Sequence, residues 1–334
     1  MDTKMWGKAL TAIPRLDKKA WTKLDVISKW LISTRAAVLI MTFLSAAIGG
    51  ILAYRNGKFN LYLWLICALG LVMAHATNNL LNDLVDHFKG TDKGNYYRAK
   101  YGPQPLEHKL MTRFEVLLYI FFTGSIAFLA GAYLVYARGI IAFYLMLAGS
   151  FFLLFYTWPL KYFGLGELAV VLVWGPLMIG GSYFISSGVW SSSACLVSLP
   201  YALGVTTVIF GKHIDKLAED RKKKIYTLPV LLGEKLSRIT VIALMLGMYF
   251  LAAYFALVRG FYPLLLVFLS LNVFRGVLQV FGKPRPKSEP KNYPKATWPL
   301  YFVAQAFVFN RKFGMLYLLG LIVDVIMKVL LKLY

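Results

Sequence analysis

The sequence predicts an all-α, polytopic membrane protein with about nine transmembrane helices. Hydrophobic residues make up 59% of its 334 residues and charged residues only 16%, whereas about 25% of the residues in a soluble domain are charged. Apolar runs of ~20 residues recur along the chain, and a helix of that length crosses the hydrocarbon core of a bilayer. Lys and Arg also concentrate in alternate connections between these runs, as in membrane proteins with a fixed orientation.

The nine expected spans follow one another from residue 36 to residue 331. They cover residues 36–54, 61–81, 116–137, 139–160, 168–190, 193–211, 239–258, 260–282 and 313–331. Residues 297–310 are also apolar, but they are too few to cross the membrane comfortably. We expect them to form a partial helix that leads into the last span.

Residues 1–35 are expected to form an amphipathic helix on the membrane surface, before a transmembrane domain at residues 36–334. Basic residues alternate there with apolar ones, among them Trp6, Trp21 and Leu31. This pattern is typical of helices that lie in the plane of the membrane interface.

The positive charges indicate how the chain is oriented. The formal net charge is +22, and 30 of the 37 Lys and Arg residues lie in segments on the side of the N-terminus. Six lie on the opposite side, and Arg275 lies within a span. Because Lys and Arg favour cytoplasmic loops, we expect a cell-membrane protein with its N-terminus inside. The one-sided placement favours contact with membrane lipid and argues against nucleic acid as a partner.

Two inside loops, residues 82–113 and 212–238, hold most of the acidic residues, so any chemistry is expected between them. In and before the first loop, polar residues three or four apart share one helical face: Asn79, Asn82, Asp83 and Asp86. Gly90 allows a turn that brings Asp92 back toward Asp86. Such oxygen ligands suit Mg²⁺. A solvated helix cap is the alternative, but ionisable residues at the end of a span are usually functional.

In the second loop, the cluster at residues 211–229 mixes Asp215, Glu219 and Asp220 with six Lys and Arg residues. Acids and bases together suggest a diphosphate held through bridging Mg²⁺, with lysines taking the remaining charge. The basic run at residues 222–224 also suits attraction to the membrane surface. His213 is either a base or an imidazole with satisfied hydrogen bonds at the interface.

Three runs of residues occur in a particular order. They are Asn82-Asp83-x-x-Asp86-x-x-x-Gly90-x-Asp92, then Tyr156-x-x-Pro159-Leu160-Lys161, and then Asp220 followed by Thr227-Leu228-Pro229. Over roughly residues 30–260 they resemble the UbiA superfamily of intramembrane prenyltransferases, in the spacing of its MenA branch. The resemblance implies helices around a central cavity and Mg²⁺-dependent transfer of a prenyl chain from a prenyl diphosphate to a lipophilic acceptor.

The resemblance also implies roles for individual residues. The implied metal ligands are Asn82, Asp83, Asp86, Asp92, Asp215 and Asp220; the implied substrate-binding residues are Asn79, Asn82, Arg98, Lys100, Tyr156, Lys212 and Lys222; and the implied catalytic residues are Asp86, Asp220 and Lys161. Mg²⁺ would stabilise the charge on the departing diphosphate. A cavity open to lipid would keep water from the allylic cation.

The second motif departs from the family pattern. Two aspartates four apart would place the partner of Asp220 at position 216, which is Lys216, and the nearest acid is Asp215. A step of five residues turns a side chain by about 140° on a helix, whereas a step of four turns it by only about 40°. Either a π-type bulge corrects the spacing, or Asp220 acts with Glu219 or with Asp215 in an altered role.

The acceptor is open at this point. The MenA resemblance favours an aromatic quinone precursor such as dihydroxynaphthoate, and a glycerol-phosphate lipid, a carotenoid or a polyprenyl-phosphate carrier are alternatives. A transporter of an anionic lipid is the alternative outside enzymes, because the four-span offset between the two polar clusters hints at an internal repeat. Against it, the polar residues cluster at one face instead of near mid-membrane.

Overall fold

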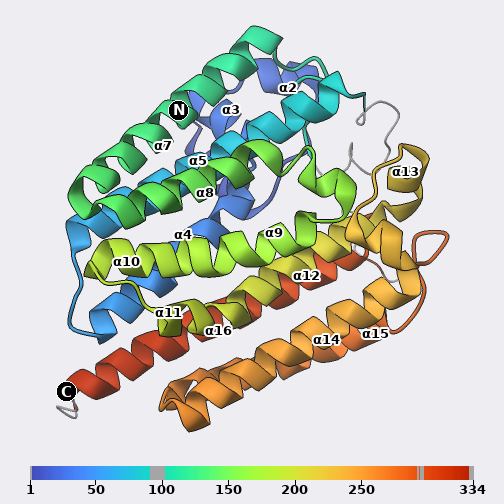
Figure 1. Ribbon diagram of the computed structural model, residues 1–334. Helices are drawn as coiled ribbons and strands as arrows, with labels where there is room; N and C mark the ends of the chain where they lie inside the picture. The colour runs from blue at the N-terminus through green and yellow to red at the C-terminus, as the bar shows by residue number, and fades with distance from the viewer. Residues whose placement is uncertain (1, 91–101, 292, 294–296, 331–334) are drawn as a thin grey trace.

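The computed structural model describes residues 2–90, 102–291, 293 and 297–330, and every regular element among them is a helix (Figure 1). The helices are α1 (Thr3–Thr11), α2 (Lys18–Thr22), α3 (Val26–Ser33), α4 (Ala36–Arg55), α5 (Leu61–Phe88), α7 (Arg113–Arg138), α8 (Ile140–Phe155), η1 (Leu160–Phe163), α9 (Gly166–Leu172), η2 (Val173–Gly180), α10 (Gly181–Ser187), α11 (Ser192–Val197), α12 (Leu199–Asp215), α13 (Leu217–Lys222), α14 (Leu228–Val258), η3 (Tyr262–Ser270), α15 (Leu271–Phe281) and α16 (Phe302–Leu330).

The N-terminal segment forms three short helices instead of the single amphipathic helix expected. Asp2, Asp17 and Asp25 each accept a backbone hydrogen bond at the start of one helix, which is the usual role of an N-cap aspartate. Trp21 and Leu31 are buried in a cluster that includes residues of α4, α5 and α7. These two apolar side chains are therefore covered by protein.

Eight helical runs in the described residues are long and apolar enough to cross a membrane, which agrees with an all-α fold of about nine spans. The ninth apolar helix, α8, has 16 residues and is about 24 Å long. It begins where expected, but it ends at Phe155 because a turn and η1 follow. The prediction of a separate partial helix at residues 297–310 is wrong, because α16 runs unbroken from Phe302 to Leu330.

Close packing of α12 against α16 forms the centre of one half of the bundle (Figure 1). A Cβ atom at Gly211 would lie 2.9 Å from the backbone of Val303, and one at Gly314 would lie 2.6 Å from the ring of Tyr201. Small residues at such positions let helix backbones approach closely, which is how transmembrane helices gain packing contacts.

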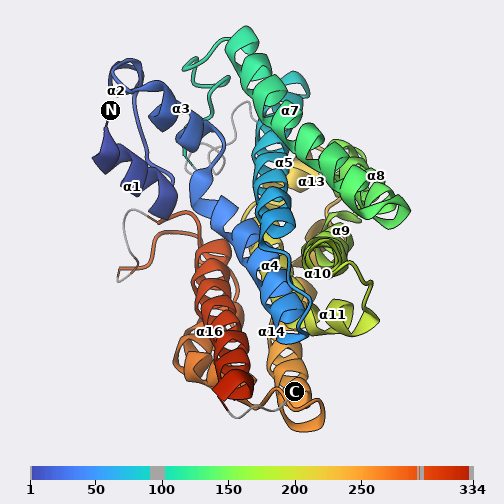
Figure 2. The same cartoon turned by 90° about the vertical axis from the view of Figure 1, so that its left-hand side faces the viewer.

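The other half of the bundle encloses a cavity of about 860 Å³ between α5, α7, α8, η2 and α12. Figure 2 shows α7 and α8 on one flank of α5, away from α16. The lining is mainly apolar, and its charged members are Arg35 and Lys212. Arg35 precedes α4 and Lys212 lies in the last turn of α12, so the charge lies at the end of the bundle where α5 also ends.

Candidate active site

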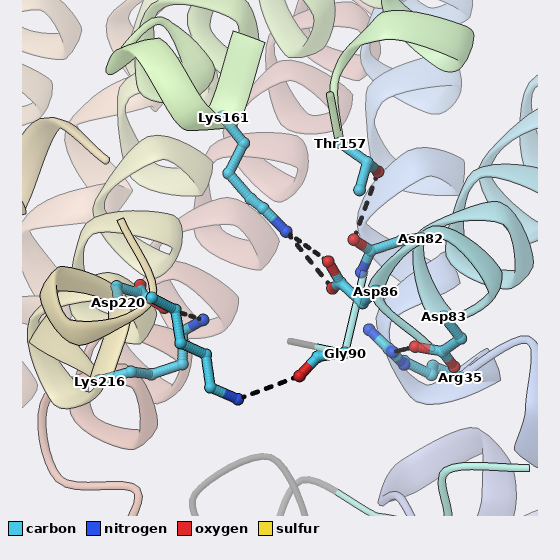
Figure 3. Close-up of polar contacts among 10 residues, drawn as sticks. Arg35, Asn82, Asp83, Asp86, Gly90, Thr157, Lys161, Lys216 and Asp220 are labelled. Carbon is cyan, nitrogen blue, oxygen red and sulfur yellow. Dashed lines mark hydrogen bonds and ion pairs between the residues drawn. The ribbon is translucent and has the colours of Figure 1, made fainter. Parts of the chain in front are cut away.

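The polar residues at the end of α5 divide into two stripes. Asn79 donates to the carbonyl oxygen of Thr34 at 2.8 Å, and Asp83, one turn later, forms an ion pair with Arg35. These contacts fix α5 to the start of α4. The other stripe, Asn82 and Asp86, turns instead toward the segment that follows α8 (Figure 3). Asp83 is therefore held by Arg35, whereas its neighbour Asp86 has a different partner.

Lys161 faces Asp86. Its Nζ donates to the two carboxylate oxygens of Asp86 at 3.0 and 3.3 Å, and both side chains are buried. The hydroxyl of Thr157 donates to Asn82 Oδ1 at 3.3 Å. The short helix η1 and the turn before it thus place one ammonium and one hydroxyl against α5 (Figure 3).

A second lysine adds positive charge beside this pair. Lys89 lies over the rings of Trp158 and Tyr162, 4.5 and 4.7 Å from their centroids. Burial and the nearby Lys161 lower the pKa of Lys89. The end of α5 and the segment around η1 therefore concentrate cations, which suits an anionic ligand.

The second polar end is built across a break in the helix. The backbone at Lys216 leaves the helical conformation between α12 and α13. Lys216 then donates to Asp220 Oδ1 at 3.0 Å, and Asp220 Oδ2 is buried with no hydrogen-bond partner in the described part of the chain. The five-residue spacing of the two aspartates is thus accommodated by a break, and the π-type bulge considered above is absent from this described segment.

Asp215 has a structural role. Its carboxylate accepts the backbone N–H groups of Tyr301, Phe302 and Val303, each at 3.0 Å, and Arg285 lies 3.5 Å away. A carboxylate at the start of a helix satisfies donors that have no partner within the helix. Both oxygens of Asp215 hold the start of α16, so this carboxylate is not available as the metal ligand that the sequence predicted.

The remaining expected residues differ in their placement. Lys212 and Tyr156 line the cavity. Lys222 is exposed, whereas its neighbour Lys223 donates to the carbonyl oxygen of Gly90 at 3.5 Å. Three expected residues, Asp92, Arg98 and Lys100, lie outside the described residues.

His213 is a buried imidazole with satisfied hydrogen bonding. Its Nδ1 lies 2.6 Å from Glu167 Oε1, and Glu167 Oε2 accepts the N–H of Leu228 at 3.4 Å. The pair joins α9, α12 and the start of α14. It positions the second polar end of the site.

Sequence reasoning missed Thr157 and the pairing of Lys216. Lys216 and Asp220 are four residues apart, a spacing at which opposite charges commonly pair, so that signal was available. No pattern around Thr157 marks it, because its contact with Asn82 joins residues 75 positions apart.

The residues present fit a divalent cation. Asn82 and Asp86 supply an amide and a carboxylate oxygen on one side, and Figure 3 shows Asp220 on the opposite side, next to Lys216. A buried acceptor without a partner, such as Asp220 Oδ2, is costly, and a water molecule bound to a cation could donate a hydrogen bond to it. Among the described residues, no group of three or more His, Cys, Asp or Glu side chains forms a metal site by itself. A cation here would also need substrate oxygens, as Mg²⁺ commonly does.

Comparison with known proteins agrees with this geometry. The model of the UbiA prenyltransferase family matches residues 42–309. UbiA prenyltransferase domain-containing protein 1 of Rattus norvegicus is 27% identical over 234 residues, which cover 67% of this chain and 66% of that protein. The chain thus matches about two thirds of that relative's length.

Two solved structures share the fold. A UbiA homologue from Aeropyrum pernix, in its apo form, has a TM-score of 0.61 at 18% identity and covers 85% of this chain and 97% of that one. A UbiA homologue from Archaeoglobus fulgidus, bound to GPP and Mg²⁺, has a TM-score of 0.58 at 16% identity and covers 86% of this chain and 99% of that one.

Proposed function

The chain belongs to the UbiA prenyltransferase family, and we propose that it transfers a prenyl chain from a prenyl diphosphate to a lipophilic acceptor inside the membrane, with Mg²⁺ as cofactor. One observation carries this proposal. Two buried lysine–carboxylate pairs, Lys161–Asp86 and Lys216–Asp220, face each other at the polar end of the bundle (Figure 3), where the large apolar cavity also has its charged lining.

The charges of the site suit a metal diphosphate. In the free protein each buried carboxylate is neutralised by its lysine. When the donor enters with its cation, each lysine can turn to a phosphate oxygen while Asn82, Asp86 and Asp220 turn to the cation or its waters. No buried charge is then left without a partner, which would be strongly destabilising.

Mg²⁺, when bound, neutralises the diphosphate and so makes it a better leaving group. We expect Lys161 to hold the departing diphosphate, because its buried ammonium lies 3.0 Å from a carboxylate oxygen of Asp86, the expected metal ligand. The binding of GPP and Mg²⁺ by the homologue from Archaeoglobus fulgidus supports this assignment.

The cavity suits the prenyl chain and the acceptor. At about 860 Å³ it lies within the usual size range of ligand pockets. Its lining includes Phe128, Leu153 and Trp174, and such apolar walls exclude water from a reactive allylic cation. The phenol of Tyr156 and the ring of Trp174, which line the cavity, favour an aromatic acceptor of the quinone-precursor type.

We also propose that the site and the N-terminus face the cytoplasm. The support is the one-sided distribution of Lys and Arg, which follows the rule for cytoplasmic loops. Accessibility labelling of single cysteines placed at residues 8 and 58, in intact cells, would test this orientation. Labelling of the residue 8 cysteine by an impermeant reagent would contradict it.

Radiolabelled prenyl transfer tests the function. The purified protein in lipid vesicles is given labelled geranyl diphosphate, Mg²⁺ and a panel of acceptors that includes dihydroxynaphthoate, a glycerol-phosphate lipid and a polyprenyl phosphate. We expect one labelled lipophilic product that depends on the acceptor and disappears with EDTA. Unchanged donor and no product with any acceptor, although the protein is folded, would contradict the proposal.

A further inference from the structure

The two sides of the proposed donor site differ in their ligands. On the α5 side, Asn82 and Asp86 offer two oxygen-bearing side chains. On the α12–α13 side, Asp220 is accompanied by Lys216, whose ammonium donates to it at 3.0 Å. Both partners are buried, with only 9% and 2% of their side chains exposed. A positive charge is thus fixed where a second metal-binding acid would have to be.

The other acids near Asp220 do not supply that second ligand. Asp215 is committed to the three N–H groups that begin α16 and to Arg285. Glu219 precedes Asp220 on α13, so it projects about 100° away around the helix. Among the described residues on this side, Asp220 therefore remains the one candidate carboxylate.

We infer that Lys216 binds the donor diphosphate directly and takes the place of a second metal ion. A single divalent cation is then bound tightly with the donor, next to Asn82 and Asp86. The inference rests on the proposed function. A cation beside Asp220 would lie close to the ammonium of Lys216 and be repelled by it. An ammonium is itself a good partner for phosphate oxygens.

The unpartnered oxygen of Asp220 fits this arrangement. Mg²⁺ keeps several of its waters when it binds to proteins, and a water of the single cation can donate to Asp220 Oδ2. Lys223 strengthens the same side, because it reaches across to the carbonyl oxygen of Gly90 at the end of α5. Lys216 and Lys223 thus outnumber the single carboxylate there.

Counting bound Mn²⁺ tests the inference without relying on turnover. The protein is saturated with geranyl thiolodiphosphate, an analogue that resists ionisation, and tightly bound Mn²⁺ is counted by electron paramagnetic resonance. We expect one Mn²⁺ per chain in the wild type and two in Lys216→Asp, which places a second carboxylate beside Asp220. Lys216→Met should keep one Mn²⁺ but bind the analogue at least roughly tenfold more weakly, the usual scale for losing a hydrogen bond to a charged group.

Lys235→Met is the matched control, because Lys235 is exposed on α14 and its loss should change neither the count nor the affinity. If Lys216→Asp fails to fold, the wild-type count and Lys216→Met decide the matter. Two tightly bound Mn²⁺ ions in the wild type, or unchanged analogue affinity in folded Lys216→Met, would overturn the inference and leave the proposed function intact. Analogue binding that never depends on Mn²⁺ would overturn the proposed function itself.

Discussion

The end of α5 and the junction of α12 with α13 solve the same problem in different ways. Each has one acid that holds the scaffold and one that faces the site. At α5 these are Asp83, paired with Arg35, and Asp86, paired with Lys161. At the junction they are Asp215, which holds the start of α16, and Asp220, paired with Lys216.

The difference lies in how the two acids are separated. α5 remains a regular helix, and Asp83 and Asp86 are neighbours on its surface; they differ because Arg35 pairs with one and Lys161 with the other. The junction breaks its helix at Lys216, so its acids diverge because they belong to different helices. Acidic residues that are close in the sequence can therefore have different roles. The residues with which they pair determine which of them can bind a ligand.

The largest effect is expected when either site acid is removed. Asp86→Ala and Asp220→Ala should each lower single-turnover prenyl transfer by at least about 10²-fold, the scale for losing one electrostatic stabiliser of a transition state. Quenched-flow measurement with labelled donor would show it, with the unfolding midpoint as the control for folding. Near-normal transfer in either folded variant would contradict the claim that Asp86 and Asp220 both act in the site.

Lys161→Met should have the next largest effect, on the donor alone. Losing an ammonium that binds phosphate should weaken donor binding by about tenfold or more, while acceptor affinity stays within about threefold. Equilibrium binding of the thiolodiphosphate analogue and of the acceptor, measured separately, gives both numbers. Lost acceptor binding with donor binding kept would reverse the assignment of this lysine.

Asp215→Ala should affect stability instead of donor chemistry. Three backbone N–H groups lose their acceptor, which costs about 1–3 kcal/mol. The apparent unfolding midpoint should therefore fall by several degrees, with Mn²⁺ and analogue binding unchanged in the folded fraction. A variant with wild-type stability and lost Mn²⁺ binding would return Asp215 to the metal site.

Thr157→Val should have the smallest effect. The hydroxyl orients Asn82 through one hydrogen bond, and a typical bond of this kind is worth about 0.5–1.5 kcal/mol. We expect Mn²⁺ affinity to fall by a few-fold in the presence of the analogue, and Thr157→Ser, which keeps the hydroxyl, to restore it. Equal weakening in both variants would show that the methyl group, and not the hydroxyl, matters.

The apolar runs predicted most of the fold because membrane helices are set largely by local hydropathy. The apolar runs did not predict helix boundaries that depend on a residue far away in the sequence. The start of α16 at Phe302 is fixed by Asp215, 87 positions earlier, and the polar residues Asn310, Arg311 and Lys312, which seemed to separate two helices, lie inside one. The three N-terminal helices did carry a local signal, an aspartate before each, which sequence reasoning overlooked.

The candidate site shows the same limit. We expected Asp86, Lys161 and Asp220 to gather at one end of the bundle because all three lie in loops on the same side of the membrane. The roles of Asp83 and Asp215 could not follow from sequence, because both depend on contacts with other helices. The pairing of Asp220 with Lys216 could be predicted from their four-residue spacing. The break at Lys216, which places Asp220 on α13 instead of α12, could not.

Binding of the donor analogue with and without a divalent cation tests the central claim most directly. If the two lysine–carboxylate pairs form a metal diphosphate site, the wild type should bind geranyl thiolodiphosphate about 10²-fold more tightly with Mg²⁺ than with EDTA. Asp86→Ala should bind it weakly and equally in both conditions. Wild-type affinity that is the same with Mg²⁺ and with EDTA would contradict the account.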